Sequence, residues 1–370
     1  MLIGIPKEIK NNEYRVGMTP AGVEVLIGEG HDVIVQETAG EGTGIPDSDY
    51  VKAGAKILGS AKEIFKKSDM IVKVKEPLEP EFPLLRRGQI LFTYLHLAGD
   101  RKLTSKTLET GCIGIAYETM EREDHSLPLL APMSEVAGRL AVIEGAKYLE
   151  HTYGGRGMLL GGVPGTEPAR VLVLGAGVVG RQSMQMAVGL GADVTIMDIN
   201  INKLREIDAI YKGRVKTLKS TPWSNRQAVM QADLVVGSVL IPGAKTPWLI
   251  KKDMLKTMRK GSVIVDVAID QGGCVETSKP TTHSNPVFEK EGIVHYCVAN
   301  MPGCVPRTST FALTNETLSY AVQIANKGWK QACKDSRIIL TGLNACDGKL
   351  TYKPVADVFD MPYTPPEEVL

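Results

Sequence analysis

The sequence has no long hydrophobic segment, no cysteine pairing pattern and no excess of either charge. No apolar run approaches the length of a bilayer span, and the N-terminus lacks the regions of a signal peptide, so we expect no membrane partner. Lysine and arginine number 43 against 42 acidic residues, whereas a nucleic-acid or membrane-surface partner would require a basic excess. The six cysteines form no C-x-x-C pair, so we expect them to be small buried side chains in a reducing cytoplasm.

Metal-ligand patterns are also lacking. Most of the histidines are scattered singly, without the spacing that zinc sites use, and we expect no metal. They stand at His31, His125, His151, His283 and His295. A chain of 370 residues with 43% hydrophobic content predicts two ordinary globular domains.

The clearest motif is a run of glycines between two apolar segments. Val171–Leu174 is typical of a strand buried on both faces, and Gly175, Gly177 and Gly180 follow it directly. In a dinucleotide-binding turn the first glycine permits a sharp bend, the second lets a pyrophosphate approach the backbone, and the third lets the helix pack on the strand. The next strand ends at Asp198, which can accept the ribose hydroxyls and repel a 2′-phosphate. The motif therefore predicts a site for NAD rather than NADP.

The order of apolar segments predicts an α/β fold with two doubly wound domains. We expect a Rossmann dinucleotide-binding domain at 131–304, inserted into a discontinuous substrate domain at 1–130 and 305–370. Strands of the first domain are expected at 2–5, 32–36, 70–75, 89–96 and 112–118, and its helices at 21–28 and 61–67. Strands of the second domain are expected at 171–174, 194–197, 215–218, 234–239, 263–268 and 294–298, in the order 3-2-1-4-5-6. Helices at 308–326 and 329–340 should return the chain to the first domain.

Candidate catalytic residues follow from the rule that ligands bind beyond the carboxyl ends of parallel strands. Arg15 lies in the loop after the first strand, Lys75 and His96 each end a strand, and Asp270 follows the strand that ends at Ala268. Arginine can hold a carboxylate with a planar fork, lysine can polarise a carbonyl, and histidine and aspartate can move protons. A cleft between the domains that gathered these four residues would suit hydride transfer to or from a small anionic 2-oxo or 2-amino acid.

Each of these four residues also has a purely structural interpretation. Arg15 could be a solvated loop charge, and His96 could be a core or rim histidine. Lys75 follows Lys73 at a period of two, so both could point from an exposed strand face. Asp270 could simply cap the turn before two glycines.

Several longer segments resemble the L-alanine dehydrogenases, a family that includes the N-terminal nucleotide-binding part of proton-translocating transhydrogenase. The resemblance runs nearly end to end, and its landmarks are Lys10-Asn-Asn-Glu-Tyr-Arg15-Val, Val74-Lys75-Glu-Pro, Tyr94-Leu-His96-Leu-Ala, Ala131-Pro-Met-Ser134-Glu-Val-Ala-Gly-Arg, Gly175-Ala-Gly-Val-Val-Gly, Val267-Ala-Ile-Asp270-Gln-Gly-Gly and Val298-Ala-Asn-Met301-Pro. It implies NAD-dependent, reversible oxidative deamination of L-alanine to pyruvate and ammonium. It also implies substrate contacts from Arg15 and Lys75, and proton transfer by His96 and Asp270.

The resemblance and the glycine motif together imply a set of NAD contacts. These fall on Ser134, Gly175, Gly177, Val178, Val179, Gly180, Asp198, Lys203, Ser220, Val239, Leu240, Val267, Ala268, Ile269, Asp270, Lys279, Val298, Ala299, Asn300 and Met301. The family often has arginine where Lys279 stands, and lysine keeps the positive charge but lacks the fork. Members of the family resemble one another in forming hexamers, so we expect a cytoplasmic homo-oligomer, and a hexamer in particular.

Other functions are compatible with the same residues. A 2-hydroxy-acid dehydrogenase could use the same arginine, histidine and aspartate, and a saccharopine-type dehydrogenase would need a larger pocket for an acidic substrate. A transhydrogenase-like NAD-binding module would dock on a separate membrane partner, and a sensor would bind NAD without turnover. Dependence on ammonium separates the hydroxy-acid alternative from an alanine dehydrogenase.

Overall fold

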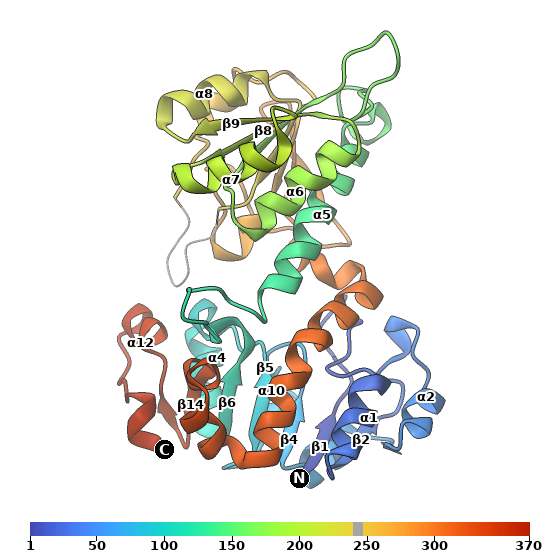
Figure 1. Ribbon diagram of the computed structural model, residues 1–370, viewed down its shortest axis with the longest axis vertical. Coiled ribbons are helices and arrows are strands. Elements are labelled where there is room, and N and C mark those ends of the chain that lie inside the picture. Colours follow the sequence, from blue (N-terminus) through green and yellow to red (C-terminus); the bar gives the residue numbers. More distant parts are fainter. Residues whose placement is uncertain (240–246) are drawn as a thin grey trace. The chain divides into compact units, whose positions relative to one another are not determined.

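The computed structural model describes residues 1–239 and 247–370, so Leu240, one of the expected NAD contacts, lies outside the described residues. The chain folds as two compact units (Figure 1). The first unit comprises 1–133 and 303–370, and the second comprises 134–302. The chain therefore leaves the first unit once and returns to complete it, which is the inserted arrangement that the sequence predicts.

The first unit is built on an eight-stranded sheet in the order β15-β14-β6-β5-β4-β1-β2-β3. Its strands are β1 (Leu2–Ile5), β2 (Asp32–Gln36), β3 (Lys56–Leu58), β4 (Met70–Val72), β5 (Ile90–Thr93), β6 (Ile113–Ala116), β14 (Leu343–Cys346) and β15 (Lys349–Leu350). Strands β1 to β6 pair in parallel, whereas β14 pairs antiparallel with β6. The strand β3 and the hairpin β14–β15 are not among the strands that the sequence predicts. Asp347 and Gly348 at the hairpin turn have φ values of 51° and 85°, which Asp-Gly turns favour.

Helices cover this sheet, and polar side chains cap the first turns of two helices that the sequence predicts. They are α1 (Pro20–Gly28), α2 (Asp47–Lys52), α3 (Ala61–Lys67), α4 (Arg101–Thr110), α10 (Pro306–Asp335), α11 (Arg337–Gly342) and α12 (Lys353–Phe359). The Thr19 side chain accepts a hydrogen bond from Gly22 N at the start of α1, and Ser60 accepts one from Glu63 N at the start of α3. The long helix α10, beside α1 in Figure 1, is interrupted at Gly328, whose φ of 73° leaves the helical path.

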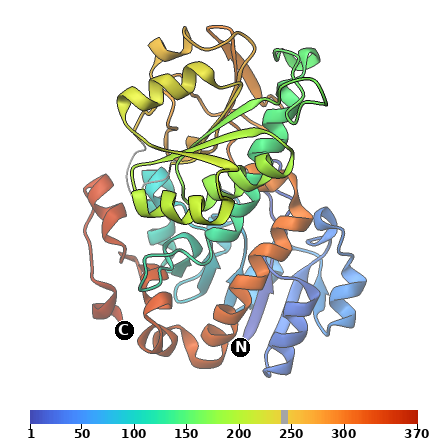
Figure 2. The same ribbon diagram turned by 45° about the horizontal axis from the view of Figure 1, so that its top comes forward.

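The second unit is built on a seven-stranded sheet in the order β12-β13-β11-β10-β7-β8-β9. Its strands are β7 (Arg170–Leu174), β8 (Asp193–Asp198), β9 (Val215–Lys219), β10 (Leu234–Gly237), β11 (Val263–Asp266), β12 (Val287–Lys290) and β13 (Ile293–Tyr296). Its helices are α5 (Ala131–Tyr148), α6 (Val178–Gly189), α7 (Ile201–Tyr211), α8 (Pro222–Gln231) and α9 (Lys252–Leu255). Apart from β12, an antiparallel edge strand, the order is the predicted 3-2-1-4-5-6. Figure 2 shows helices on both sides of these strands, as a doubly wound fold requires.

Three candidate residues lie further from their strands than the sequence predicts. β4 ends three residues before Lys75, β5 ends three residues before His96, and β11 ends four residues before Asp270, which lies on the short 3-10 helix η6 (Val267–Gln271). Side-chain acceptors end two of these strands, because the Glu8 carboxylate takes the backbone N–H of Lys75 and the Glu118 carboxylate takes that of His96. Lys75 and His96 therefore lie in the loops that follow their strands, and Asp270 lies on η6. Across residues 1–239 and 247–370, no helix has the length and apolar character needed to cross a membrane.

Candidate functional site

The turn that follows β4 is fixed by a buried cluster of charges. Lys73 is fully buried, and its Nζ lies 3.3 Å from Glu8 Oε2 and 2.5 Å from Glu81 Oε1. Glu8 Oε1 also accepts hydrogen bonds from the backbone N–H groups of Val74 at 2.6 Å and Lys75 at 3.2 Å. This cluster holds the backbone that carries Lys75, and the interpretation of the two lysines as one exposed strand face is wrong because both are buried.

Arg15 is a buried residue, so its interpretation as a solvated loop charge is also wrong. Only 2% of it is exposed. Its Nε and Nη2 atoms donate to the two carboxylate oxygens of Glu13 at 2.7 and 2.5 Å, and Nη1 lies 3.0 Å from Met133 Sδ. Burial disfavours the charge, but the hydrogen bonds and the charge of Glu13 outweigh it and raise the pKa of Arg15. Arg15 is therefore a buried cation that Glu13 holds in place.

Lys75 is a buried cation that has no partner of its own among the described residues. It is 9% exposed, and within the two described ranges its ammonium group forms no hydrogen bond or ion pair. Burial, followed by the charge of Arg15, lowers the pKa of Lys75. A desolvated ammonium group near a guanidinium is stabilised by an anion that reaches both, and a carboxylate has two oxygens with which to do so.

His96 lies on the turn after β5, and its side chain is 44% exposed, so it is not a core histidine. Its Nδ1 lies 2.9 Å from Glu76 Oε2, and Glu76 also forms an ion pair with Lys10. Burial alone would raise the pKa of Glu76, but the hydrogen bond to His96 and the charges of Lys10 and Lys75 lower this pKa well below its usual range. Glu76 is therefore an ionised acceptor that faces the imidazole ring.

The backbone at His96 is held in a left-handed conformation, with φ 51° and ψ 30°. Its N–H donates to Glu118 Oε1 at 2.6 Å, and the N–H of Leu95 donates to the same oxygen at 3.1 Å. The ring of Tyr94 lies 5.7 Å from that of His96, and its hydroxyl donates to the carbonyl of Leu129 at 2.5 Å. Together these contacts stabilise a backbone conformation that a non-glycine residue rarely adopts.

The acidic residues around these cations are the part of the site that sequence reasoning missed. They are Glu8, Glu13, Glu76, Glu81 and Glu118. A signal for two of them was available, because Glu13 stands two positions before Arg15 and Glu76 directly follows Lys75. When an acidic residue stands this close in sequence to a basic residue that follows a strand, the pattern indicates that the basic side chain is paired or held inside the protein and is not solvated.

In the second unit, the glycine loop has the backbone that its sequence predicts. Gly175 has a φ of 102°, and an added Cβ would lie 3.0 Å from Val239 Cγ2. A Cβ on Gly180 would lie 1.8 Å from the carbonyl oxygen of Gly175, so this position requires glycine for close packing. At Gly177, the N-cap of α6, a Cβ would meet no atom of the described residues within 4 Å. The open backbone at Gly177 and the N–H groups of α6 suit a pyrophosphate.

Asp198 ends β8, as the sequence predicts, and its carboxylate supports the glycine loop. Oδ2 accepts a hydrogen bond from Ala176 N and Oδ1 accepts one from Asn200 N, both at 2.7 Å. The backbone carbonyl of Asp198 accepts from Ser220 N at 2.9 Å, and Lys203 lies half-buried on the following helix α7. Each carboxylate oxygen has a further lone pair, which suits ribose hydroxyls.

The other expected NAD residues follow the ends of neighbouring strands. The range 267–270 lies beyond β11, and the range 298–301 lies beyond β13. The Asp270 side chain is exposed and accepts no hydrogen bond among the described residues, so it does not cap the turn there. Lys279 has its Nζ 4.5 Å from the ring centroid of Phe288, over an aromatic face.

The structure brings together three of the four candidate catalytic residues. All three residues, Arg15, Lys75 and His96, lie in the first unit. The charge of Arg15 acts on Lys75, and Glu76 interacts with both Lys75 and His96. Asp270 belongs to the second unit, which is described by itself. The expected NAD contacts from Ser134 onward also belong to the second unit.

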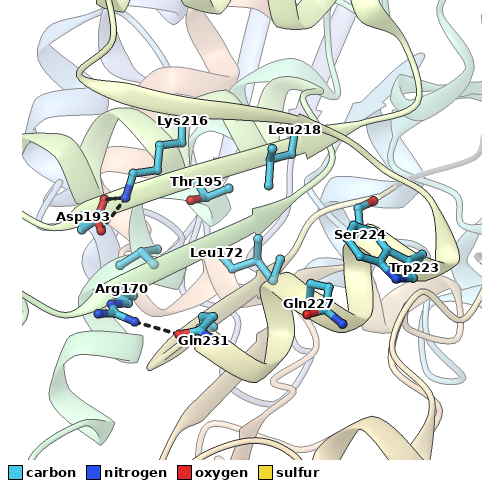
Figure 3. Close-up of a pocket in the computed structure, with 13 residues that line it drawn as sticks. Arg170, Leu172, Asp193, Thr195, Lys216, Leu218, Trp223, Ser224, Gln227 and Gln231 are labelled. Carbon is cyan, nitrogen blue, oxygen red and sulfur yellow. Dashed lines mark hydrogen bonds and ion pairs between the residues drawn. The ribbon is translucent and has the colours of Figure 1, made fainter.

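A cavity of about 410 Å³ lies at β7, β8, β9 and α8 of the second unit (Figure 3). None of the candidate residues is among the described residues that line it. Two of its charged side chains already have partners within the lining, because Lys216 Nζ lies 2.7 Å from Asp193 Oδ2 and Arg170 Nη1 donates to the amide oxygen of Gln231 at 2.8 Å. Trp223 is largely exposed beside them. This cavity therefore does not mark the dinucleotide site.

Comparisons with known proteins find the same family along nearly the whole chain. Family models described as alanine dehydrogenase/PNT match residues 4–137 with their N-terminal domain and residues 141–353 with their C-terminal domain. The chain is 57% identical to an alanine dehydrogenase of Methanococcus maripaludis over 100% of both chains, and 52% identical to one of Mycolicibacterium smegmatis over 98% of both. Among solved structures, an L-alanine dehydrogenase superposes with a TM-score of 0.94 at 50% identity, covering 97% of this chain and 99% of that one. A transhydrogenase from Sinorhizobium meliloti superposes with a TM-score of 0.81 at 25% identity, covering 95% and 99%.

Proposed function

The chain belongs to the alanine dehydrogenase/PNT family, and we propose that it catalyses the NAD-dependent, reversible oxidative deamination of L-alanine to pyruvate and ammonium. The observation that carries this proposal is the buried ammonium group of Lys75, which lies in the field of Arg15 and has no partner among the residues that the structure describes. The transhydrogenase-like and hydroxy-acid alternatives are not favoured, because the full-length relatives bear the name alanine dehydrogenase.

The two buried cations explain why the substrate should be a small carboxylate. Arg15 and Lys75 repel each other, and burial removes the water that would screen this repulsion. A substrate carboxylate relieves the repulsion and supplies the missing partner for Lys75, whereas an uncharged substrate does neither. Glu13 keeps the guanidinium of Arg15 in place, so the arrangement is ready before the substrate binds.

We propose that the second unit binds NAD. The open backbone at Gly177 and the start of α6 suit the pyrophosphate, and Asp198 supplies a negative charge that disfavours the 2′-phosphate of NADP. The further proposed contacts are Ser134, Val178, Val179, Lys203, Ser220, Val239, Val267, Ala268, Ile269, Asp270, Lys279, Val298, Ala299, Asn300 and Met301. When bound, the nicotinamide ring accepts or returns the hydride.

The side chains of the protein bind the substrate and move its protons. Lys75 and Arg15 orient alanine by its carboxylate, and loss of hydride from Cα produces an imine to which water adds. His96, with Asp270 as the proposed second proton carrier, removes and returns protons while the carbinolamine collapses to pyruvate and ammonia. Lys75 stabilises the negative charge that develops on the carbonyl oxygen.

Oxidation of NADH by pyruvate, followed with and without ammonium, tests this proposal. Oxidation that requires ammonium supports it, oxidation without ammonium would indicate a hydroxy-acid dehydrogenase, and binding without oxidation would indicate a nucleotide-binding module. Replacing either His96 or Asp270 with alanine should lower turnover by about 10²–10⁴-fold, the usual contribution of general acid–base catalysis. Turnover close to that of the parent would contradict the assigned roles.

Two properties of the protein are proposed together with this function. Membership of the family supports a homohexamer, which sedimentation equilibrium would measure directly. Five of the cysteines are buried thiols outside any disulfide, namely Cys112, Cys274, Cys297, Cys333 and Cys346, which suits a reducing compartment such as the cytoplasm.

A further inference from the structure

Glu76 contacts the candidate proton carrier but has no part in the reaction described above. We propose that Glu76 is a positioning residue that holds the Nδ1–H of His96, so that Nε2 is the ring atom that exchanges protons, and that Lys10 opposes this effect by binding the same carboxylate. The inference rests on the proposed function, because it assigns a partner to the proton carrier of that reaction.

The contact between the two side chains determines which ring nitrogen can act. Glu76 Oε2 lies 2.9 Å from Nδ1 of His96, and the carboxylate is largely buried. An ionised carboxylate only accepts hydrogen bonds, so the neutral imidazole must carry its proton on Nδ1. The lone pair then lies on Nε2, at the far side of a ring whose side chain is 44% exposed. The contact thus leaves Nε2 as the basic nitrogen of the ring.

The rest of the site fixes the ring but does not replace this contact. Glu118 binds the backbone N–H of His96 at 2.6 Å and thereby holds the left-handed turn. Tyr94 lies beside the ring at 5.7 Å without a hydrogen bond to it in the described residues. Glu76 is therefore the acceptor that selects the proton position, whereas Glu118 and Tyr94 act on the backbone and on the ring plane.

Several charges face the pair and set the direction of each expected effect. The charged or titratable neighbours of the pair are Lys10 in the loop after β1, Lys75 in the turn after β4, Tyr94 after β5, and Glu118 on η4 (Tyr117–Thr119), whereas Arg15 and Glu13 act on Lys75. Glu76 stabilises the protonated ring, and Lys10 weakens this by neutralising part of the carboxylate charge. Removing Glu76 and removing Lys10 should consequently have opposite effects on the pH at which the ring gains its second proton.

The experiment compares the pH profiles of kcat/KM for L-alanine in the parent, Glu76→Gln and Lys10→Met. In Glu76→Gln the acidic midpoint should move to lower pH by about one unit or more, because a hydrogen bond to a charged partner changes an equilibrium by roughly tenfold or more. Its kcat should fall by about tenfold to a hundredfold while KM for NAD stays within about threefold, since the contact serves proton transfer and not cofactor binding. In Lys10→Met the midpoint should move to higher pH.

Two further variants separate positioning from a general structural effect. Glu76→Asp keeps the charge at a shorter reach and should recover part of the lost kcat and of the shifted midpoint. Glu79→Gln is the matched control, because Glu79 stands three positions away, is 62% exposed and pairs with Lys102 and Lys106. It should keep the profile of the parent. If Glu76→Gln does not fold, Glu76→Asp and Lys10→Met carry the same test.

A titration without turnover distinguishes failure of this inference from failure of the proposed function. The protein labelled in its histidine rings is titrated by nuclear magnetic resonance without substrate, and the His96 signal is assigned from its absence in His96→Gln. A lower midpoint in Glu76→Gln than in the parent supports the inference even if the parent does not oxidise alanine. Equal midpoints, or a loss of kcat with an unchanged pH profile, would overturn it.

Discussion

Replacing Lys73 with methionine should reduce the free energy of unfolding of the first unit by about 3–5 kcal/mol at pH 7, the usual loss when one partner of a buried ion pair is removed. Lys73 is fully buried, at 3.3 Å from Glu8 and 2.5 Å from Glu81. Methionine keeps most of the apolar stem but removes the charge that both carboxylates share. Glu8 retains its backbone donor at Val74, and Glu81 retains its donor at Leu78. These neutral donors do not compensate for the lost cation.

Protonation of the carboxyl groups limits this loss and makes it depend on pH. A glutamic acid of ordinary pKa takes up a proton at a cost of roughly 3.7 kcal/mol at pH 7 but roughly 1 kcal/mol at pH 5. Burial already raises the pKa of Glu8, and removal of Lys73 should raise it further. A group whose pKa is raised on folding stabilises the protein at low pH, and this stability is lost as the pH rises through the raised value. The deficit of the variant should therefore shrink to about 1–2 kcal/mol at pH 5.

Urea unfolding at both pH values measures this deficit, and hydrogen exchange in peptides from β1 and β4 reports the first unit separately. Lys353→Met is the matched control, because it removes an exposed ion pair with Asp357 at 2.9 Å. That control should change the free energy of unfolding by less than about 1 kcal/mol. A Lys73→Met variant as stable as the control at pH 7, or one whose deficit stays constant at pH 5, would refute the reasoning.

The remaining predictions concern the two ligand sites. Gly177→Ala should melt like the parent yet bind NADH about tenfold more weakly or worse, because its methyl group meets no described atom but enters the space of the pyrophosphate. Gly180→Ala should weaken NADH binding and also lower the melting temperature, since its Cβ would lie 1.8 Å from Gly175 O. Calorimetry measures the melting temperature of each variant and NADH fluorescence measures its binding, so together they distinguish Gly177→Ala from Gly180→Ala. Asp198→Asn should raise kcat/KM for NADPH relative to NADH by about tenfold, and an unchanged ratio would mean that the acid does not discriminate. In the parent, KM for pyruvate should rise with pH, and this rise should begin below the pH range in which an ordinary lysine loses its proton, because the pKa of Lys75 is lowered. Lys75→Met should remove this dependence.

The sheet of the second unit could be predicted because its signals are local. Val171–Leu174 is a continuous apolar run and is buried throughout, and the glycines that follow it have the turn and close packing that their spacing predicts. Capping is equally local, so Thr19 and Ser60 mark the starts of α1 and α3. The cations of the candidate site could be selected for a similar reason, since each follows a recognisable strand.

The partners of those cations depend on contacts between distant parts of the chain. Glu8 reaches the backbone at Lys75 across 67 positions, and Glu118 reaches that at His96 across 22. No periodicity or spacing specifies such pairs, and the same contacts explain why the strands end earlier than their apolar runs predict. Strand β3, at Lys56–Leu58, has only three residues, which is too short for a pattern of alternation to show.

Transfer of hydride from Cα of alanine is the central claim, and deuterium tests it most directly. The protein is incubated with NAD and L-alanine that carries deuterium at Cα, and the reduced nucleotide is analysed by mass spectrometry. The account predicts NADH that contains the deuterium, formed together with equal amounts of pyruvate and ammonium. Reduced nucleotide without the label, or no reduction by alanine, would contradict it.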